Sequence, residues 1–110
     1  MSDAKIKVIV KRPDEKYGHV THMSNTLKAF QTAVDGPIET VRLTDEAICI
    51  VNEEGKLRGL EPNFFMGRYP FGDLIVGTVV VVGTDGEEFG DCPIDFNTWK
   101  SVMETWRWKK

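Results

Sequence analysis

The stretch that decides the fold is residues 74–82, with the sequence LIVGTVVVV. It is apolar except for Gly77 and Thr78, and its valines and isoleucine are β-branched residues that favour strands. A helix needs ~20 apolar residues to cross a bilayer, so this short run predicts no membrane span. Because both faces of the pleat are apolar, the pattern predicts one interior strand in a sheet that is covered on both faces.

Turn signals separate the segments on either side of this strand. Thr84-Asp85-Gly86 predicts a tight turn, after which residues 87–89 return beside the interior strand. Upstream, residues 6–11 stop before a proline, and residues 38–43 and 47–51 flank the turn-like residues 44–46. The predicted strands are residues 6–11, 19–23, 38–43, 47–51, 74–82 and 87–89, which indicates a mostly antiparallel sheet.

Two segments have helical periodicity. The first follows Ser24 and Asn25, either of which can cap it, and ends before a Gly-Pro pair at residues 36–37. Its apolar stripe is Leu27, Phe30 and Val34. The second helix spans residues 95–108 and can be capped by Asp95 or Asn97. Its apolar stripe is Phe96, Trp99, Val102, Met103 and Trp106.

These elements predict a single α+β domain over residues 1–110. Its expected architecture is one mostly antiparallel sheet of about five to seven strands with two helices packed on it. Two helices hardly suffice to cover both faces of a sheet with so apolar a strand, so the sequence also predicts a homo-oligomer.

Charge and reactive residues exclude several classes of function. The chain has 17 acidic and 14 basic side chains, evenly interspersed, which makes a nucleic-acid partner unlikely. Cys49 and Cys92 lack CxxC spacing and are interpreted as reduced thiols of a cytoplasmic protein. His19 and His22 are expected on opposite faces of a strand, so we predict no metal site. No nucleophile has a base and an orienting acid in a recognisable pattern, so the chain is expected to be noncatalytic and free of cofactors.

The candidate ligand site lies in residues 52–70. Residues 52–55 have the composition of a tight hairpin turn, and residues 59–70 have no clear period, which is typical of functional loops. Basic groups, amides and one aromatic ring in this segment would suit a small anionic, nucleotide-like ligand. The candidate ligand-binding residues are Asn52, Lys56, Arg58, Asn63, Arg68 and Tyr69. The alternative is a loop that only covers the core.

A second set of candidates would contact a protein. Phe64 and Phe65 make part of the irregular segment apolar, and Trp106 and Trp108 lie near the end of the last helix. Tryptophan is enriched among the residues that dominate protein interfaces, so these four side chains are predicted to contact a protein partner if they are exposed.

Three segments of the chain resemble a known family. They are NTLKAFQ leading to GPIE at residues 36–39, NEEGKLRGLEPN at residues 52–63, and DLIVGT at residues 73–78. Their order and spacing resemble the DUF3846 family, small uncharacterised proteins of bacteria, phages and mobile elements. The resemblance covers about residues 6–89, leaves out the tail from Phe96, and departs from the family at residues 64–66.

The resemblance implies a mobile-element origin and a compact protein in the cytoplasm of a bacterial host, and it supplies no catalytic residue. We therefore expect a small noncatalytic binding protein that counters or modulates a host system, possibly a defence system. It would do so by sequestering an anionic nucleotide-like signal or, alternatively, by occluding a host protein through apolar patches.

Overall fold

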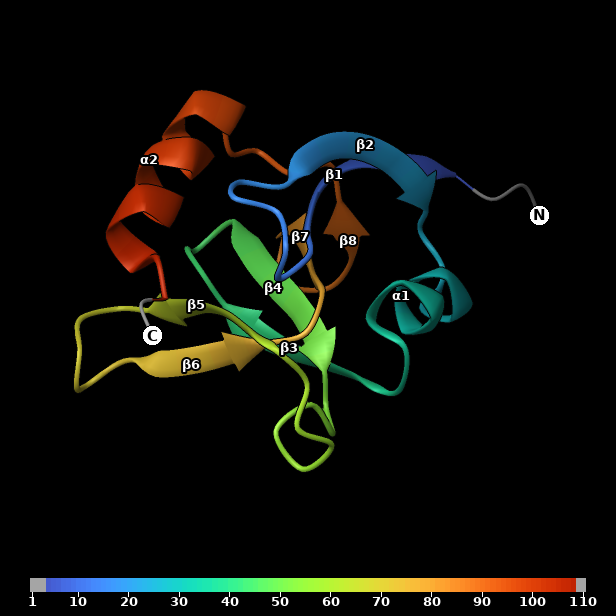
Figure 1. Cartoon of the computed structure of the whole chain (residues 1–110). Coiled ribbons are helices and arrows are strands. Elements are labelled where there is room, and N and C mark those ends of the chain that lie inside the picture. The colour runs from blue at the N-terminus through green and yellow to red at the C-terminus, as the bar shows by residue number, and fades with distance from the viewer. Residues whose placement is uncertain (1–3, 109–110) are drawn as a thin grey trace.

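The computed structural model describes residues 4–108, which form eight strands and two helices (Figure 1). In chain order these are β1 (Lys5–Lys11), β2 (His19–Ser24), α1 (Leu27–Val34), β3 (Ile38–Arg42), β4 (Ala47–Asn52), β5 (Pro62–Met66), β6 (Asp73–Val76), β7 (Val79–Thr84), β8 (Phe89–Gly90) and α2 (Phe96–Trp106). The predicted α+β class, with a mostly antiparallel sheet and two packed helices, is confirmed. Within residues 4–108, no helix is both long enough and apolar enough to cross a membrane.

The main sheet has six strands in the order β2-β1-β7-β4-β3, with β8 beside the end of β7. All of its strand pairs are antiparallel. In the middle of the sheet, Val80 of β7 is opposite Val10 of β1 on one side and Ile50 of β4 on the other. The interior position predicted for the valine run is therefore confirmed.

The prediction of one continuous strand over residues 74–82 is wrong, because the chain bends at Gly77. Gly77 has a φ of 75°, and its N–H donates to the Glu61 carbonyl at 2.8 Å. A Cβ at this position would lie 2.9 Å from Leu60 Cδ1, so a side chain would meet both strain and a clash. Strand β6, before the bend, pairs with β5 in a separate two-stranded sheet.

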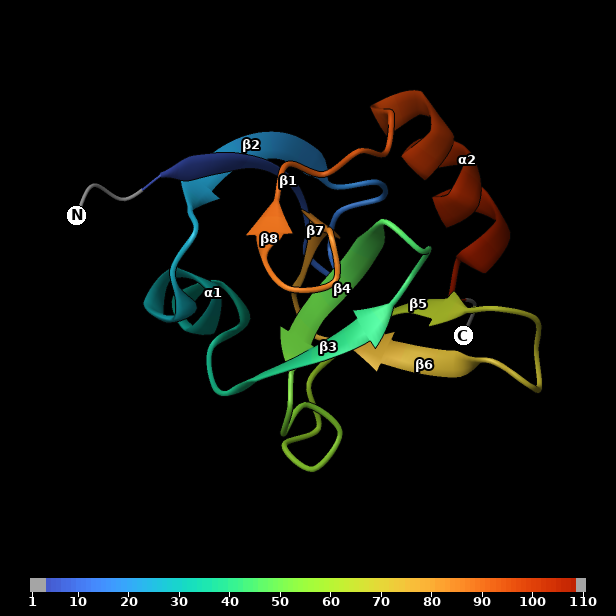
Figure 2. The same ribbon diagram turned by 180° about the vertical axis from the view of Figure 1, so that it is seen from behind.

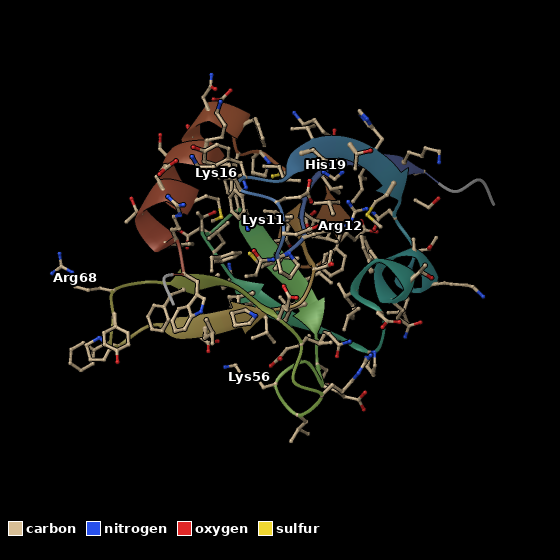
Figure 3. The ribbon with its side chains drawn as sticks, viewed as in Figure 1. Lys11, Arg12, Lys16, His19, Lys56 and Arg68 are labelled. Carbon is tan, nitrogen blue, oxygen red and sulfur yellow. The ribbon has the colours of Figure 1, made fainter. Side chains whose placement is uncertain are left out.

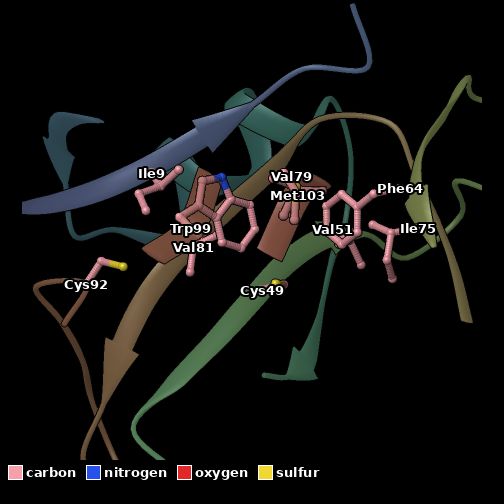
Figure 4. Close-up of a cluster of buried hydrophobic side chains, with 10 residues drawn as sticks. All are labelled: Ile9, Cys49, Val51, Phe64, Ile75, Val79, Val81, Cys92, Trp99 and Met103. Atoms are coloured by element: carbon pink, nitrogen blue, oxygen red, sulfur yellow. The ribbon is translucent and has the colours of Figure 1, made fainter. Parts of the chain in front are cut away.

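The two faces of β7 carry two separate hydrophobic clusters, because successive strand side chains point to opposite faces. One cluster packs under α1 and contains Ile6, Val8, Phe30, Val34, Ile48, Ile50, Val80 and Val82. The other packs under α2 and the small sheet and contains Ile9, Cys49, Val51, Phe64, Ile75, Val79, Val81, Cys92, Trp99 and Met103 (Figure 4). In both views the two helices lie on opposite sides of the central strands (Figures 1 and 2).

One chain thus covers both faces of the main sheet. The four residues from Val79 to Val82 are all 0% exposed without any second copy. The small sheet supplies the cover that two helices were not expected to provide. The reason for predicting a homo-oligomer, an uncovered face of the sheet, therefore does not apply. The homo-oligomer itself stays a prediction.

The helix boundaries agree with the sequence pattern more closely than the caps do. Thr26 caps α1 by accepting a hydrogen bond from the Ala29 N–H, so both predicted caps are wrong. Ser24 still belongs to β2, and the Asn25 side chain donates to the Phe89 carbonyl at 2.9 Å. Leu27 was placed on the buried stripe but is 58% exposed. Asp95 caps α2 as predicted, but α2 ends at Trp106, so the predicted end at residue 108 is wrong and Trp108 lies beyond the helix.

Candidate binding surface

The segment that follows β4 is a series of turns rather than the predicted hairpin, since β5 pairs with β6 and not with β4. Asn52, the last residue of β4, is 4% exposed. Its Nδ2 donates to the carbonyls of Val34 and Asp35, both at 3.0 Å, and its Oδ1 accepts from the Glu54 N–H at 2.7 Å. These bonds satisfy carbonyls at the end of α1, so Asn52 has a structural role.

The two basic candidates in the same turns are engaged with acidic residues. Arg58 donates to the Asp35 carbonyl at 2.6 Å and pairs with the Asp35 carboxylate at 3.0 Å. Asp35 ends α1 with a φ of 64°, so Arg58 adds a cation at the negative end of that helix. Lys56 forms an exposed ion pair with Asp73 at 2.6 Å. Both cations therefore already have anionic partners within the chain.

Asn63 lies in β5 and is 6% exposed. Its Nδ2 donates to the carbonyls of Lys11 and Gly77 at 2.9 and 2.8 Å, and its Oδ1 accepts from the Lys11 ammonium at 2.6 Å. The predicted ligand amide thus joins the small sheet to β1 and to the bend after β6.

Arg68 and Tyr69 lie at the tip of the β5–β6 hairpin, which extends away from the rest of the chain (Figures 1 and 2). Figure 3 shows Arg68 on this hairpin and Lys56 on the separate loop after β4. Asn52 and Lys56 line one cavity of about 260 Å³, and Asn52 and Arg58 both donate to the Asp35 carbonyl. The structure does not gather all six predicted ligand residues around one cavity, because Asn63 and the hairpin residues Arg68 and Tyr69 lie elsewhere.

The aromatic candidates do come together. Phe65 lies between two rings, with its centroid 5.5 Å from Tyr69 and 6.4 Å from Trp108, and it stacks on the latter at an interplanar angle of 22°. With Trp106, these residues border one open surface cavity of about 370 Å³. We call Phe65, Tyr69, Trp106 and Trp108 the aromatic surface.

Phe64 does not belong to this surface, contrary to its predicted contact role. It is 1% exposed, because strand alternation turns it inward from Phe65. Its ring packs edge-on against Trp99 at 5.9 Å and stacks on Trp106 at 6.0 Å. Its backbone also forms an antiparallel bridge with Arg107, which holds the end of α2 beside the hairpin. Phe64 is therefore a buried residue that supports the aromatic surface through its contacts with Trp106 and Arg107.

The remaining lining of the cavity is small or polar, and consists of Gly67, Thr105 and Arg107. The rings offer apolar and stacking contacts, whereas Arg107 offers hydrogen-bond donors. The Thr105 hydroxyl already donates to the Ser101 carbonyl at 3.3 Å. This arrangement suits an apolar or aromatic group that is accompanied by a hydrogen-bond acceptor.

The thiols are poor nucleophiles. Burial, with a smaller contribution from Cys92, raises the pKa of the Cys49 thiol to about 12. Burial also raises the pKa of Cys92. In the described part of the chain, no group of three or more His, Cys, Asp or Glu residues could hold a metal ion.

Sequence reasoning missed Lys11, which is 4% exposed at the end of β1. A signal was present, because Lys11 shares a strand face with the apolar Ile9. It also missed Phe71, which is 91% exposed on the same hairpin as Tyr69. Nothing in the local pattern distinguishes an exposed phenylalanine from a buried one.

Comparison with known proteins agrees with the family resemblance and extends it. The family model described as Domain of unknown function (DUF3846) matches residues 6–105. The match includes nearly all of α2, which the resemblance in the sequence motifs left out. No curated protein and no solved structure matches the chain. Because the family model covers nearly the whole chain, the protein belongs to the DUF3846 family.

Proposed function

We propose that this protein is a noncatalytic binding module that occludes a protein of a bacterial host cell through its aromatic surface. The observation that carries the proposal is the convergence of four aromatic side chains from the β5–β6 hairpin and the end of α2 around one open cavity. A phage or mobile-element origin and a role against a host system remain part of this proposal.

The exposure of the hairpin supports a protein partner. Tyr69 and Phe71 are 76% and 91% exposed, and both lie on the segment that projects from the body. Tyrosine, tryptophan and phenylalanine are enriched in the buried centres of protein interfaces. A projecting hairpin with exposed aromatic rings beside an aromatic cavity has the composition expected of a contact site.

The small anionic ligand predicted from residues 52–70 receives less support. Lys56 and Arg58 pair with Asp73 and Asp35, and the amides of Asn52 and Asn63 are bonded to the protein. A phosphate at Lys56 or Arg58 would lie beside the carboxylate that already pairs with the cation, and that carboxylate would repel it. Arg68 and Tyr69 alone provide a charge and a ring at the hairpin tip.

The test is affinity capture from a lysate of the bacterial host with three proteins: the wild type, a Tyr69→Ala/Trp108→Ala double variant, and a Leu27→Ala/Leu57→Ala control. Leu27 and Leu57 are exposed, and neither lines the cavity of the aromatic surface. We expect the wild type and the control to retain the same host protein and the double variant to lose it. Retention by all three, or by none, contradicts the proposal.

Calorimetry with mono-, di- and cyclic nucleotides tests the other mechanism. Binding that Arg68→Ala or Arg58→Ala weakens by about 1.5–3 kcal/mol would favour a sequestered nucleotide over a protein partner.

A further inference from the structure

Lys11 is a buried ammonium that lacks a direct counterion. It is 4% exposed, and its Nζ donates to Asn63 Oδ1 at 2.6 Å and to the Arg12 carbonyl at 3.5 Å. None of the ion pairs among residues 4–108 includes it. Hydrogen bonds to neutral oxygens alone offset little of the desolvation free energy of a buried charge.

The surroundings of Lys11 include an open cavity of about 270 Å³. Lys11 and Asn63 line this cavity. Its other charged lining residues are Asp14, Glu15, Lys16 and Arg107. Figure 3 labels Lys11 on β1 and Lys16 on the loop between β1 and β2, and this loop contacts α2 through the Lys16–Glu104 pair. An ammonium with spare donor capacity therefore borders a space that a ligand can enter.

The carboxylates of this cavity do not act as the missing counterion. Glu15 accepts hydrogen bonds from the Arg12 N–H at 2.9 Å and from His19 Nδ1 at 2.8 Å. Asp14 is exposed, so water screens its charge. Desolvation lowers the pKa of Lys11 below its ordinary value, although Glu15 and Asp14 act to raise it. Their attraction is therefore too weak to offset the burial of the ammonium.

We propose that the cavity beside Lys11 binds a single carboxylate group, which pairs with the Lys11 ammonium and lies near Arg107. Lys16 also lines the cavity, but its ammonium already pairs with the Glu104 carboxylate at 3.7 Å. The volume lies below the ~300–1,000 Å³ of cavities that hold drug-sized ligands, which favours a small group such as a carboxylate. A carboxylate on a small molecule and the glutamate side chain of a partner protein share the required chemistry. The site is distinct from the aromatic cavity, although Arg107 and Trp108 border both.

The test is calorimetry of the full chain with two matched pairs of probes. The first pair is benzoate and its neutral analogue benzamide, and the second is the blocked peptides acetyl-Gly-Glu-Gly-amide and acetyl-Gly-Gln-Gly-amide. We expect saturable binding of the benzoate, the glutamate peptide or both, and no binding of either neutral analogue. Whichever anion binds with the higher affinity identifies the source of the carboxylate, a small molecule for benzoate or a partner protein for the glutamate peptide. Failure of both anions to bind overturns the proposal.

Lys11→Gln removes the charge and keeps an N–H donor toward Asn63, so it is preferred to an apolar substitution. It should weaken anion binding by about tenfold or more, which corresponds to about 1.4 kcal/mol. Lys28→Gln makes the same change at an exposed position of α1 and should leave the affinity unchanged. Equal weakening by both variants, or by neither, overturns the proposal.

A measurement on the unmodified protein decides the matter even if Lys11→Gln fails to fold. Lysine-selective ¹³C NMR follows the titration of each Cε with and without a saturating concentration of the anion that binds more tightly in calorimetry, benzoate or the glutamate peptide. Pairing with a carboxylate favours the charged amine, so the titration midpoint of Lys11 should rise while that of Lys28 stays constant. An unchanged midpoint for Lys11 overturns the proposal, whatever happens to the aromatic surface.

Discussion

Asn63 Oδ1 accepts a hydrogen bond from the Lys11 ammonium at 2.6 Å, and the same amide donates to the Lys11 carbonyl at 2.9 Å. Lys11 ends β1 of the main sheet, whereas Asn63 lies in β5 of the small sheet. This reciprocal pair therefore fixes the two sheets relative to each other. It also supports the aromatic surface, since Phe64 and Phe65 follow Asn63 in β5.

Asn63→Ala should lower the free energy of unfolding by about 2–4 kcal/mol, because it leaves the buried Lys11 ammonium and two carbonyls without their partner. Urea denaturation measures the change. Asn97→Ala, at an exposed position of α2, should alter stability by no more than ~0.5 kcal/mol. Equal stability of the two variants would show that the Asn63 bonds are not important in solution.

Phe30→Ala should destabilise the fold by about 3–5 kcal/mol, as expected when a buried aromatic ring is removed. Phe30 is 1% exposed and packs edge-on against Phe89 at 5.5 Å. Leu27→Ala, on the same helix but 58% exposed, is the matched control and should cost much less. Identical unfolding midpoints for these two variants would refute the assignment of the helix face.

The stability of the wild type should increase relative to that of Lys11→Gln as the pH rises toward 10.5. Desolvation lowers the pKa of Lys11 in the folded state below 10.5, despite the opposing attraction of Glu15 and Asp14. Below the folded pKa the burial penalty is fully present, because the amine is charged in both states. Between the folded pKa and 10.5 the unfolded chain keeps the proton and the folded chain loses it, so the penalty is relieved. A difference in unfolding free energy that stays constant from pH 7 to 10.5 contradicts this prediction.

The two thiols should resist modification in the native protein. Burial raises the pKa of Cys49 to about 12, and Cys92 is 2% exposed with a raised pKa. With a thiol reagent at pH 8, we expect slow reaction in buffer and rapid reaction of both cysteines in denaturant. Rapid stoichiometric labelling of native protein would indicate an accessible nucleophile and would weaken the noncatalytic proposal.

Local pattern predicted most of the elements, and long-range contacts decided what the polar residues do. The α1 stripe at Phe30 and Val34 and the Asp95 cap follow from spacing over one or two turns. The roles of Asn52 and Asn63 do not, because their hydrogen-bond partners lie in segments distant along the chain. An amide suited to a ligand and an amide that joins two strands look the same in sequence.

The break at Gly77 was missed for a similar reason. An apolar run with one glycine is compatible with a continuous strand, and the bend depends on Leu60 and Glu61 packing and bonding against Gly77. The missed bend also concealed the β5–β6 hairpin, so residues 62–66 were interpreted as an irregular loop. The aromatic candidates Phe65, Trp106 and Trp108 were identified from residue type alone, and only the fold brings them together.

The central claim, that the aromatic surface contacts a host protein, is tested most directly by site-specific photo-crosslinking in host cells. A photoreactive phenylalanine analogue replaces Phe71, which is 91% exposed on the hairpin, or Leu57, which is 93% exposed on the loop after β4. The two positions are matched in exposure and differ in location. We predict that position 71 crosslinks to one host protein and that position 57 does not. Equal crosslinking at both positions, or none at position 71, would contradict the account.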